Sequence, residues 1–176
     1  MKRTVTLVND IGIPKGTADL QEAHDGEGML HQAISVYVFR NQRSEILIQR
    51  RSSEKRLWHG FLANTCCSHP YEKESPRDAG QRRLFEELGF TCSLRPVGTL
   101  LYHERDPFGQ GVEYEHVILL IGDVDENPEI RPNPSEVSEY RWADLKELQW
   151  EMAMADAHER FAPWFLLGLP AVLKNF

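Results

Sequence analysis

Cysteine and histidine side chains stand together in the segment "NTCCSHP", where Cys66 and Cys67 are adjacent and His69 follows closely. A cysteine can be a soft metal ligand, a nucleophile, a weak acid or a small buried filler, and histidine is equally versatile. Two more histidines, His24 and His31, lie seven residues apart. Any one of these histidines alone is more often a surface or hydrogen-bonded residue than a metal ligand, so the rest of the chain must decide.

A pair of carboxylates follows later, in "GVEYEHV", where Glu113 and Glu115 are two residues apart. Residues two apart in a strand point to the same face, so both carboxylates can address one point. His116 then points to the opposite face, and we expect it to be structural or exposed.

The segment "ESPRDAGQRRLFEELGF" predicts the strongest helix of the chain. Ser75 suits the N-cap, Pro76 the first turn, and Asp78 completes a pattern like a capping box. Gly89 is expected to end the helix in a left-handed conformation.

Glu86 and Glu87 fall at the C-terminal end of this helix, where the helix dipole disfavours negative charge. Arg82 and Arg83 can offset that cost by pairing with residues three or four positions away. The residues alone favour a solvated charged face, and a metal bridge to a phosphate is the alternative.

The spacing of these charges resembles the Nudix box, a loop–helix–loop that aims carboxylates at Mg²⁺ and so holds a diphosphate. Ser68 stands where the box has its first glycine, and Arg83 where it has a glutamate that helps to activate water. The resemblance therefore implies a Nudix scaffold that holds a diphosphate without cutting it. The matching positions are Glu74, Arg82, Leu84, Glu86, Glu87, Gly89 and Phe90.

"TCCSHP", the two earlier histidines, the altered box and "EYE" together resemble the type I isopentenyl diphosphate isomerases, from about residue 5 to residue 170. That branch accepts both departures from the box. The resemblance implies an α+β fold with a Nudix-like mixed β-sheet sandwiched between helices, in a single domain over residues 1–176. It also implies interconversion of isopentenyl and dimethylallyl diphosphate by a metal-dependent 1,3-allylic proton shift through a carbocation.

The same resemblance implies the site residues. Cys67 and Glu115 would exchange protons with the substrate, with Tyr102 beside Glu115 and Trp164 over the site. Glu87 and the backbone carbonyl of Cys67 would bind Mg²⁺ that arrives with the substrate diphosphate. A second site for Mn²⁺, Zn²⁺ or Mg²⁺ would be formed by His24, His31, His69, Glu113 and Glu115.

The basic run "IQRRSSEKR" is a candidate for the diphosphate contacts, because guanidinium groups bind phosphate oxygens in pairs. Arg51 and Lys55 match the phosphate-binding positions of the family best, and Arg50 and Arg56 flank them. Leu20 stands where some bacterial members carry a lysine that reaches the diphosphate.

Composition indicates an ordinary globular chain, with 176 residues, 41% hydrophobic and 27% charged. The net charge of −7 disfavours a nucleic acid partner. Three cysteines cannot form a disulfide framework, and no secretory signal is visible, so a reducing, cytoplasmic location is expected. The apolar segment 161–173 is too short to span a bilayer. The oligomeric state stays open.

Strands and helices are expected to mix without strict alternation, which favours a mixed sheet with helices packed on it. A hairpin is expected where two apolar runs flank "RNQRS". The expected strands are "VTLVND", 31–39, 45–50, 94–102 and 112–121, and the expected helices are 74–90, 135–150 and 162–169.

Two other functions compete with the isomerase interpretation. A Nudix pyrophosphohydrolase would release phosphate from nucleoside diphosphate derivatives, which an isomerase would not. A structural zinc protein would use Cys66, Cys67 and His69, although adjacent cysteines are poorly spaced for one tetrahedral ion.

Overall fold

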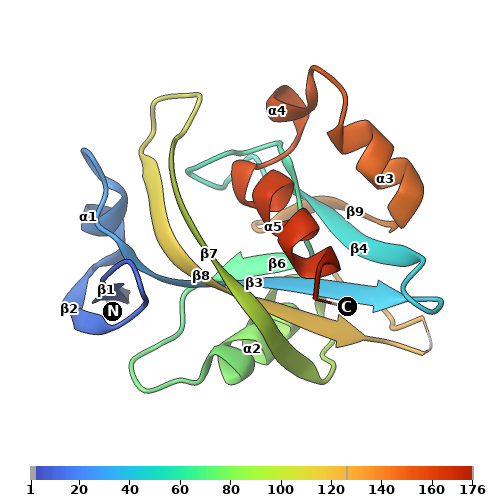
Figure 1. Ribbon diagram of the computed structural model, residues 1–176, viewed down its shortest axis with the longest axis horizontal. Helices are drawn as coiled ribbons and strands as arrows, with labels where there is room; N and C mark the ends of the chain where they lie inside the picture. Colours follow the sequence, from blue (N-terminus) through green and yellow to red (C-terminus); the bar gives the residue numbers. More distant parts are fainter. Residues whose placement is uncertain (1–2, 126, 176) are drawn as a thin grey trace.

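A curled, mixed β-sheet forms the centre of the molecule, with helices on both of its faces (Figure 1). The computed structural model describes residues 3–125 and 127–175. Strand β3 (His31–Arg40) lies at the middle of the sheet and pairs with β8 (Val112–Asp123) in parallel along most of its length. This confirms the predicted α+β fold with a mixed sheet between helices.

Three antiparallel strands pair with successive parts of the other edge of β3. β1 pairs at His31, β6 at residues 34–36, and β4 at residues 39–40. The remaining strands extend the sheet outward from these. The strands are β1 (Thr4–Val8), β2 (Pro14–Asp19), β4 (Glu45–Arg51), β5 (Leu62–Ala63), β6 (Cys66–Ser68), β7 (Leu94–Arg105) and β9 (Val137–Asp144).

The two faces of the sheet build two separate cores. One core packs under helix α2, and the other lies on the face covered by α5 (Figure 1). Successive side chains along each strand point to opposite cores. The adjacent Cys66 and Cys67 therefore face opposite sides of the sheet: Cys66 is buried with α2 and Cys67 faces the α5 side. The helices are α1 (Leu20–His24), α2 (Pro76–Leu88), α3 (Leu145–Met152), α4 (Ala157–Arg160) and α5 (Pro163–Leu173).

Helix α2 forms as its sequence predicts. The Ser75 side chain accepts a hydrogen bond from the backbone N–H of Asp78 at 3.1 Å. Gly89 ends the helix at φ = 75°, in the left-handed region that favours glycine. The hairpin of β3 and β4 and the strands over 94–102 and 112–121 are also confirmed.

The prediction of one helix over 135–150 is wrong in its first half. Residues 137–144 form strand β9, which pairs with β4 along the whole of that strand, and the helix begins only at Leu145. Asp144 caps that helix by accepting hydrogen bonds from the N–H groups of Lys146 and Glu147. The exposed edge of β4 needs backbone partners, and this long-range pairing overrides local helix preference.

The helix expected at 162–169 is present and runs on to Leu173 as α5. No described helix has the length and apolar character needed to cross a bilayer.

Helix α5 approaches β3 so closely at Gly168 that any side chain there meets Tyr37. An added Cβ would collide with the Tyr37 hydroxyl oxygen and lie 3.2 Å from its ring carbon Cζ. Overpacking of this kind costs about 1–3 kcal/mol, which exceeds the gain of up to about 1 kcal/mol from alanine's better helix propensity. Gly168→Ala is therefore expected to lower the free energy of unfolding in urea.

Tyr37→Phe supplies the control, because it removes the hydroxyl oxygen that the added Cβ would meet. Its removal should cost little and should restore most of the stability of Gly168→Ala in the double variant. Equal losses in the single and double variants would contradict this account of the packing.

Candidate active site

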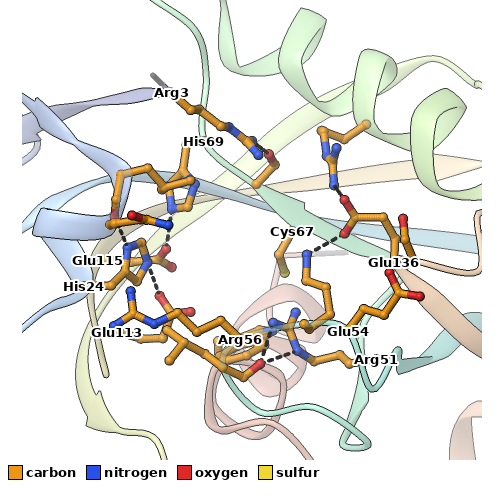
Figure 2. Close-up of a pocket in the computed structure, with 18 of the residues that line it drawn as sticks. Arg3, His24, Arg51, Glu54, Arg56, Cys67, His69, Glu113, Glu115 and Glu136 are labelled. Carbon is orange, nitrogen blue, oxygen red and sulfur yellow. Dashed lines mark hydrogen bonds and ion pairs between the residues drawn. The ribbon is translucent and has the colours of Figure 1, made fainter. Parts of the chain in front are cut away.

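A cavity of about 420 Å³ opens on the α5 side of the sheet, where α1, β6 and β8 meet the loop that follows β4 (Figure 2). Most of the residues predicted to do chemistry line it. They are His24, Arg51, Lys55, Cys67, His69, Tyr102, Glu113, Glu115 and Trp164.

Three imidazoles gather at one end of this cavity. His31 Nε2 lies 3.1 Å from His69 Nε2, and the ring centres of His24 and His31 are 4.7 Å apart. The Nδ1 atoms of His24 and His31 each lie 2.7 Å from a backbone carbonyl, so each donates its proton there. Their Nε2 atoms therefore point toward the cluster. Burial lowers the pKa of His24, but the hydrogen bond to Glu113 outweighs it and raises that pKa to about 9, so a metal would have to displace a proton from this ring.

Glu115 completes this group. Its Oε1 lies 2.8 Å from His69 Nε2 and 3.5 Å from His31 Nε2, and its Oε2 accepts a hydrogen bond of 2.7 Å from the Tyr102 hydroxyl. One ligand atom from each of His24, His31, His69 and Glu115 lies within 4.8 Å of all the others. Glu113 is outside this group of four, and its Oε2 contacts His24 Nε2 at 3.1 Å.

This donor set fits a divalent cation. Imidazole nitrogens held by backbone carbonyls, with carboxylate oxygens beside them, are the usual surroundings of protein-bound transition metals. Burial lowers the pKa of His69 to about 3, so that its ring is neutral near pH 7 and can act as a ligand.

The pKa values of the Glu113 and Glu115 carboxyl groups shift in opposite directions. Burial raises the pKa of Glu113, and the negative charge of Glu115 adds to that effect. Burial also opposes the charge on Glu115, but its contacts with His31 and His69 outweigh that effect and hold its pKa well below the usual value. Glu115 is the ionised member of the pair.

The thiol of Cys67 makes two hydrogen bonds. The Asn64 amide nitrogen donates to the carbonyls of Val36 and Cys66, so its oxygen faces Cys67 Sγ at 3.2 Å and can only accept. The S–H group therefore donates to Asn64, and the Ser35 hydroxyl, 3.1 Å from the sulfur, donates to it. Burial raises the pKa of Cys67 to about 12, which keeps it a neutral thiol.

Aromatic side chains form one wall of the cavity. Trp164, at the start of α5, is 3% exposed and packs edge-on against Trp58 with ring centres 5.4 Å apart. Its ring also lies 6.3 Å from that of Tyr102, and the Arg51 guanidinium is 5.1 Å from its centre. The side chains of Cys67 and Glu115 therefore line the same cavity as these aromatic rings.

Basic side chains surround the rest of the cavity. Arg51 donates twice to the carbonyl of Leu57, and Lys55 pairs with Glu136 at 2.5 Å. Arg56 lines the cavity as well, but Arg50 turns away and pairs with Glu139 on the surface.

Glu87, the predicted ligand of a substrate-borne Mg²⁺, lies behind Arg83 and does not line the cavity. Its carboxylate accepts hydrogen bonds from Gln49 at 3.0 Å and from Arg83 at 2.5 Å. Arg83 also reaches Glu136 at 3.1 Å, so the arginine of the altered box occupies the space between Glu87 and the cavity.

Several residues that line the cavity or contact its side chains were missed from the sequence. Asn64 stood inside "NTCCSHP", which was a signal that could have found it. The other three belong to no motif that the sequence displays. Only the folded sheet brings Arg3 to Ser68, Ser35 to Cys67, and Glu136 to Lys55.

Comparison with known proteins identifies a domain family and named relatives. The NUDIX domain family model matches residues 29–165. A Pectobacterium atrosepticum protein named isopentenyl-diphosphate Delta-isomerase is 41% identical over 163 residues, which cover 93% of this chain and 87% of that protein. A protein of the same name from Dinoroseobacter shibae is 43% identical, over 84% of this chain and 81% of that one.

Solved structures support the fold. The crystal structure of DR0079 from Deinococcus radiodurans superposes with a TM-score of 0.73 at 20% identity, over 96% of this chain and 98% of that one. A MutT protein from Methanosarcina mazei gives a TM-score of 0.61 at 17% identity, over 83% of this chain and 95% of that one.

Replacing one imidazole should weaken metal binding selectively. His31→Gln is expected to lower the affinity for Zn²⁺ or Mn²⁺ by at least about tenfold, the smallest loss typical of changes around a metal centre. His116→Gln is the matched control, since its neighbour in β8, Glu115, faces the cavity and His116 does not. Calorimetric titration of the metal-free protein measures both, and equal affinities in the two variants would contradict the site.

Proposed function

The chain belongs to the Nudix-domain family of isopentenyl-diphosphate Delta-isomerases, and we propose that it interconverts isopentenyl and dimethylallyl diphosphate with Cys67 and Glu115 as its proton-transfer pair. One observation carries the assignment of residues. A neutral thiol and an ionised carboxylate line the same cavity, under the same aromatic wall.

The reaction requires an acid, a base and dry surroundings. An isolated double bond is a very weak base, and its protonation gives a tertiary carbocation that water would trap. A 1,3-shift moves a proton onto the terminal carbon and removes another from the carbon two positions away, so one group must give a proton and a second must take one.

Cys67 is the acid in the direction from isopentenyl diphosphate. In the free protein its S–H group donates to Asn64, and rotation about the Cβ–Sγ bond turns the same hydrogen toward the cavity. When the proton leaves, the Ser35 hydroxyl still donates to the sulfur and stabilises the thiolate.

Glu115 is the base in that direction. Its Oε2 accepts from the Tyr102 hydroxyl, which holds the carboxylate in place and lies beside the oxygen that receives the proton. The step leaves a thiolate and a carboxylic acid, which return to their starting states by exchange with solvent or serve the reverse reaction directly.

Trp164 faces the cavity as the group that tolerates positive charge. The electron-rich face of an indole attracts a cation by up to about 2 kcal/mol when water is excluded. In the free protein the Arg51 guanidinium lies 5.1 Å from the centre of that ring, a cation–π contact that supports this role.

A divalent metal would be held by His24, His31, His69 and Glu115, with Glu113 beside His24. We propose Mn²⁺, Zn²⁺ or Mg²⁺ for this site, because imidazole and carboxylate donors suit all three. When bound, the metal supplies positive charge that fixes the orientation and ionisation of the Glu115 carboxylate.

The substrate diphosphate would lie against Arg51 and Lys55, with a second Mg²⁺ carried in by the substrate. Glu87 and the Cys67 carbonyl are the proposed ligands for that ion. Glu87 reaches it only when Arg83 exchanges its carboxylate partner for a phosphate oxygen, because Arg83 covers Glu87 in the free protein.

Neither rival function accounts for these contacts as well. A pyrophosphohydrolase needs a carboxylate where Arg83 stands, and a cation cannot bind the metal that activates water. A zinc site using both cysteines would need them on one side of the sheet, yet Cys66 is buried against α2 and Cys67 faces the cavity. The three cysteines are free thiols, which supports the proposed cytoplasmic location.

Incubation of isopentenyl diphosphate with the protein and Mg²⁺ in D₂O tests the activity. Deuterium is expected in the dimethylallyl product, because the acid exchanges its proton with solvent before each turnover. Substrate that returns unchanged and unlabelled would overturn the proposed function.

Cys67→Ala and Glu115→Gln should each lower kcat by at least about 100-fold, as expected for the loss of a general acid or base, while the protein stays folded. Cys66→Ala is the matched control, since that thiol packs against α2, and its kcat should stay within a few-fold of the original. Unfolding of Cys67→Ala, followed by circular dichroism, would favour a structural role instead.

Ser35→Ala should lower kcat while KM and the urea midpoint stay close to their original values. Hydrogen bonds to charged groups contribute about 1.5–3 kcal/mol, so the lost stabilisation of the thiolate predicts a decrease of roughly 10-fold to 100-fold. A change in KM with constant kcat would show that Ser35 acts on substrate binding and not on the thiol.

A further inference from the structure

Arg3 lines the cavity from the start of β1, a segment with no recognised motif. Its Nη2 donates a hydrogen bond of 2.7 Å to the Ser68 hydroxyl, next to Cys67 in β6 (Figure 2). Its Nε atom is buried without a hydrogen-bond partner among the described residues. The guanidinium thus keeps unused donor capacity at the wall of the cavity.

The charges around Arg3 are unbalanced. Burial lowers the pKa of Arg3, and repulsion from Arg83 and Arg82 adds to that effect, while Tyr71 and Glu136 oppose it without reversing it. Both neighbours have carboxylate partners of their own, Glu74 for Arg82 and Glu87 for Arg83. Within residues 3–125 and 127–175, no carboxylate forms an ion pair with Arg3.

The other cavity cations differ in this respect. Lys55 pairs with Glu136, and Arg56 pairs with Asp25. Arg51 has only the carbonyl of Leu57 and the ring of Trp164. Arg3 and Arg51 are therefore the two cavity guanidiniums that an incoming anion can bind without breaking an ion pair, and they lie on different sides of the opening (Figure 2).

We propose that Arg3 is a substrate-binding residue that contacts the diphosphate, an inference that rests on the isomerase function proposed above. The fold places Arg3 beside Leu20, the position at which some bacterial members carry a lysine that reaches the diphosphate. The backbone N–H of Leu20 donates to the carbonyl of Arg3 at 2.8 Å, and Leu20 also lines the cavity. Arg3 thus supplies from the neighbouring strand the positive charge that position 20 lacks in this chain.

Substitution of Arg3 tests this through binding and not through activity alone. Arg3→Gln should raise KM for isopentenyl diphosphate, and the inhibition constant of Mg²⁺–pyrophosphate, by about tenfold, the loss expected for one charge-assisted contact. The kcat should change by less than about threefold, because Arg3 lies outside the proton-transfer pair. Adding Leu20→Lys to Arg3→Gln should recover part of the affinity.

Arg131→Gln is the matched control, because that arginine is 74% exposed and pairs with Glu129. It should leave KM and the inhibition constant unchanged. An Arg3→Gln variant with a lower urea midpoint but an unchanged pyrophosphate constant would overturn the proposal and leave Arg3 with the structural contact to Ser68 alone.

The two proposals fail in different ways. Active protein whose affinity for pyrophosphate does not depend on Arg3 overturns only the role of Arg3. Inactive wild-type protein overturns the isomerase function, and direct calorimetric titration with Mg²⁺–pyrophosphate then decides whether Arg3 binds a diphosphate.

Discussion

The site depends on strand β3 being hydrogen-bonded along both edges. β8 runs parallel to one edge, and β1, β6 and β4 share the other. Because side chains alternate along every strand, the register sends His31, Ser35, Cys67 and Glu115 to the same face although they are far apart in sequence. A slip of one residue in β6 would exchange Cys67 for Cys66 and bury the Cys67 thiol under α2. The pairing of a three-residue strand therefore decides which of two adjacent cysteines meets the cavity.

Local signals predicted the parts of the fold that depend on local physics. Ser75, Pro76 and Gly89 specify the ends of α2, and apolar runs with polar connections specify β3, β4, β7 and β8. The strand at 137–144 was mistaken for helix because its formation depends on the unpaired edge of β4, which the local sequence does not contain. The same limit applies to the site. Residues within recognisable motifs were nominated, whereas Arg3 and Glu136 come from segments that only the sheet brings near.

The charged side chains around the cavity already form ion pairs, and an incoming anion could replace one partner in such a pair. Glu136 accepts from both Lys55 and Arg83, and these two cations outweigh the effect of burial and lower its pKa to about 2. Arg83 in turn covers Glu87. A diphosphate that took over Lys55 and Arg83 would release Glu87 for a cation that the diphosphate carries. Such an exchange costs less than placing bare charges in the cavity, because each buried ion always has a partner. It also explains how a chain of net charge −7 can bind an anion.

The proposed carbocation needs an apolar wall, and the hydrophobic core itself supplies one. Trp164, Tyr102 and the partly buried Cys67 pack in the same core as Tyr37, Phe165 and Leu169, so the wall of the cavity is one side of the core under α5. Helix α5 therefore has two roles: its first turn presents Trp164 to the cavity, and its middle fits against Tyr37 at Gly168. Looser packing at Gly168 would move the indole as well as destabilise the fold. Because the same burial keeps Cys67 protonated, a change that let water into this core would lower the pKa of the proposed acid and expose the proposed cation together.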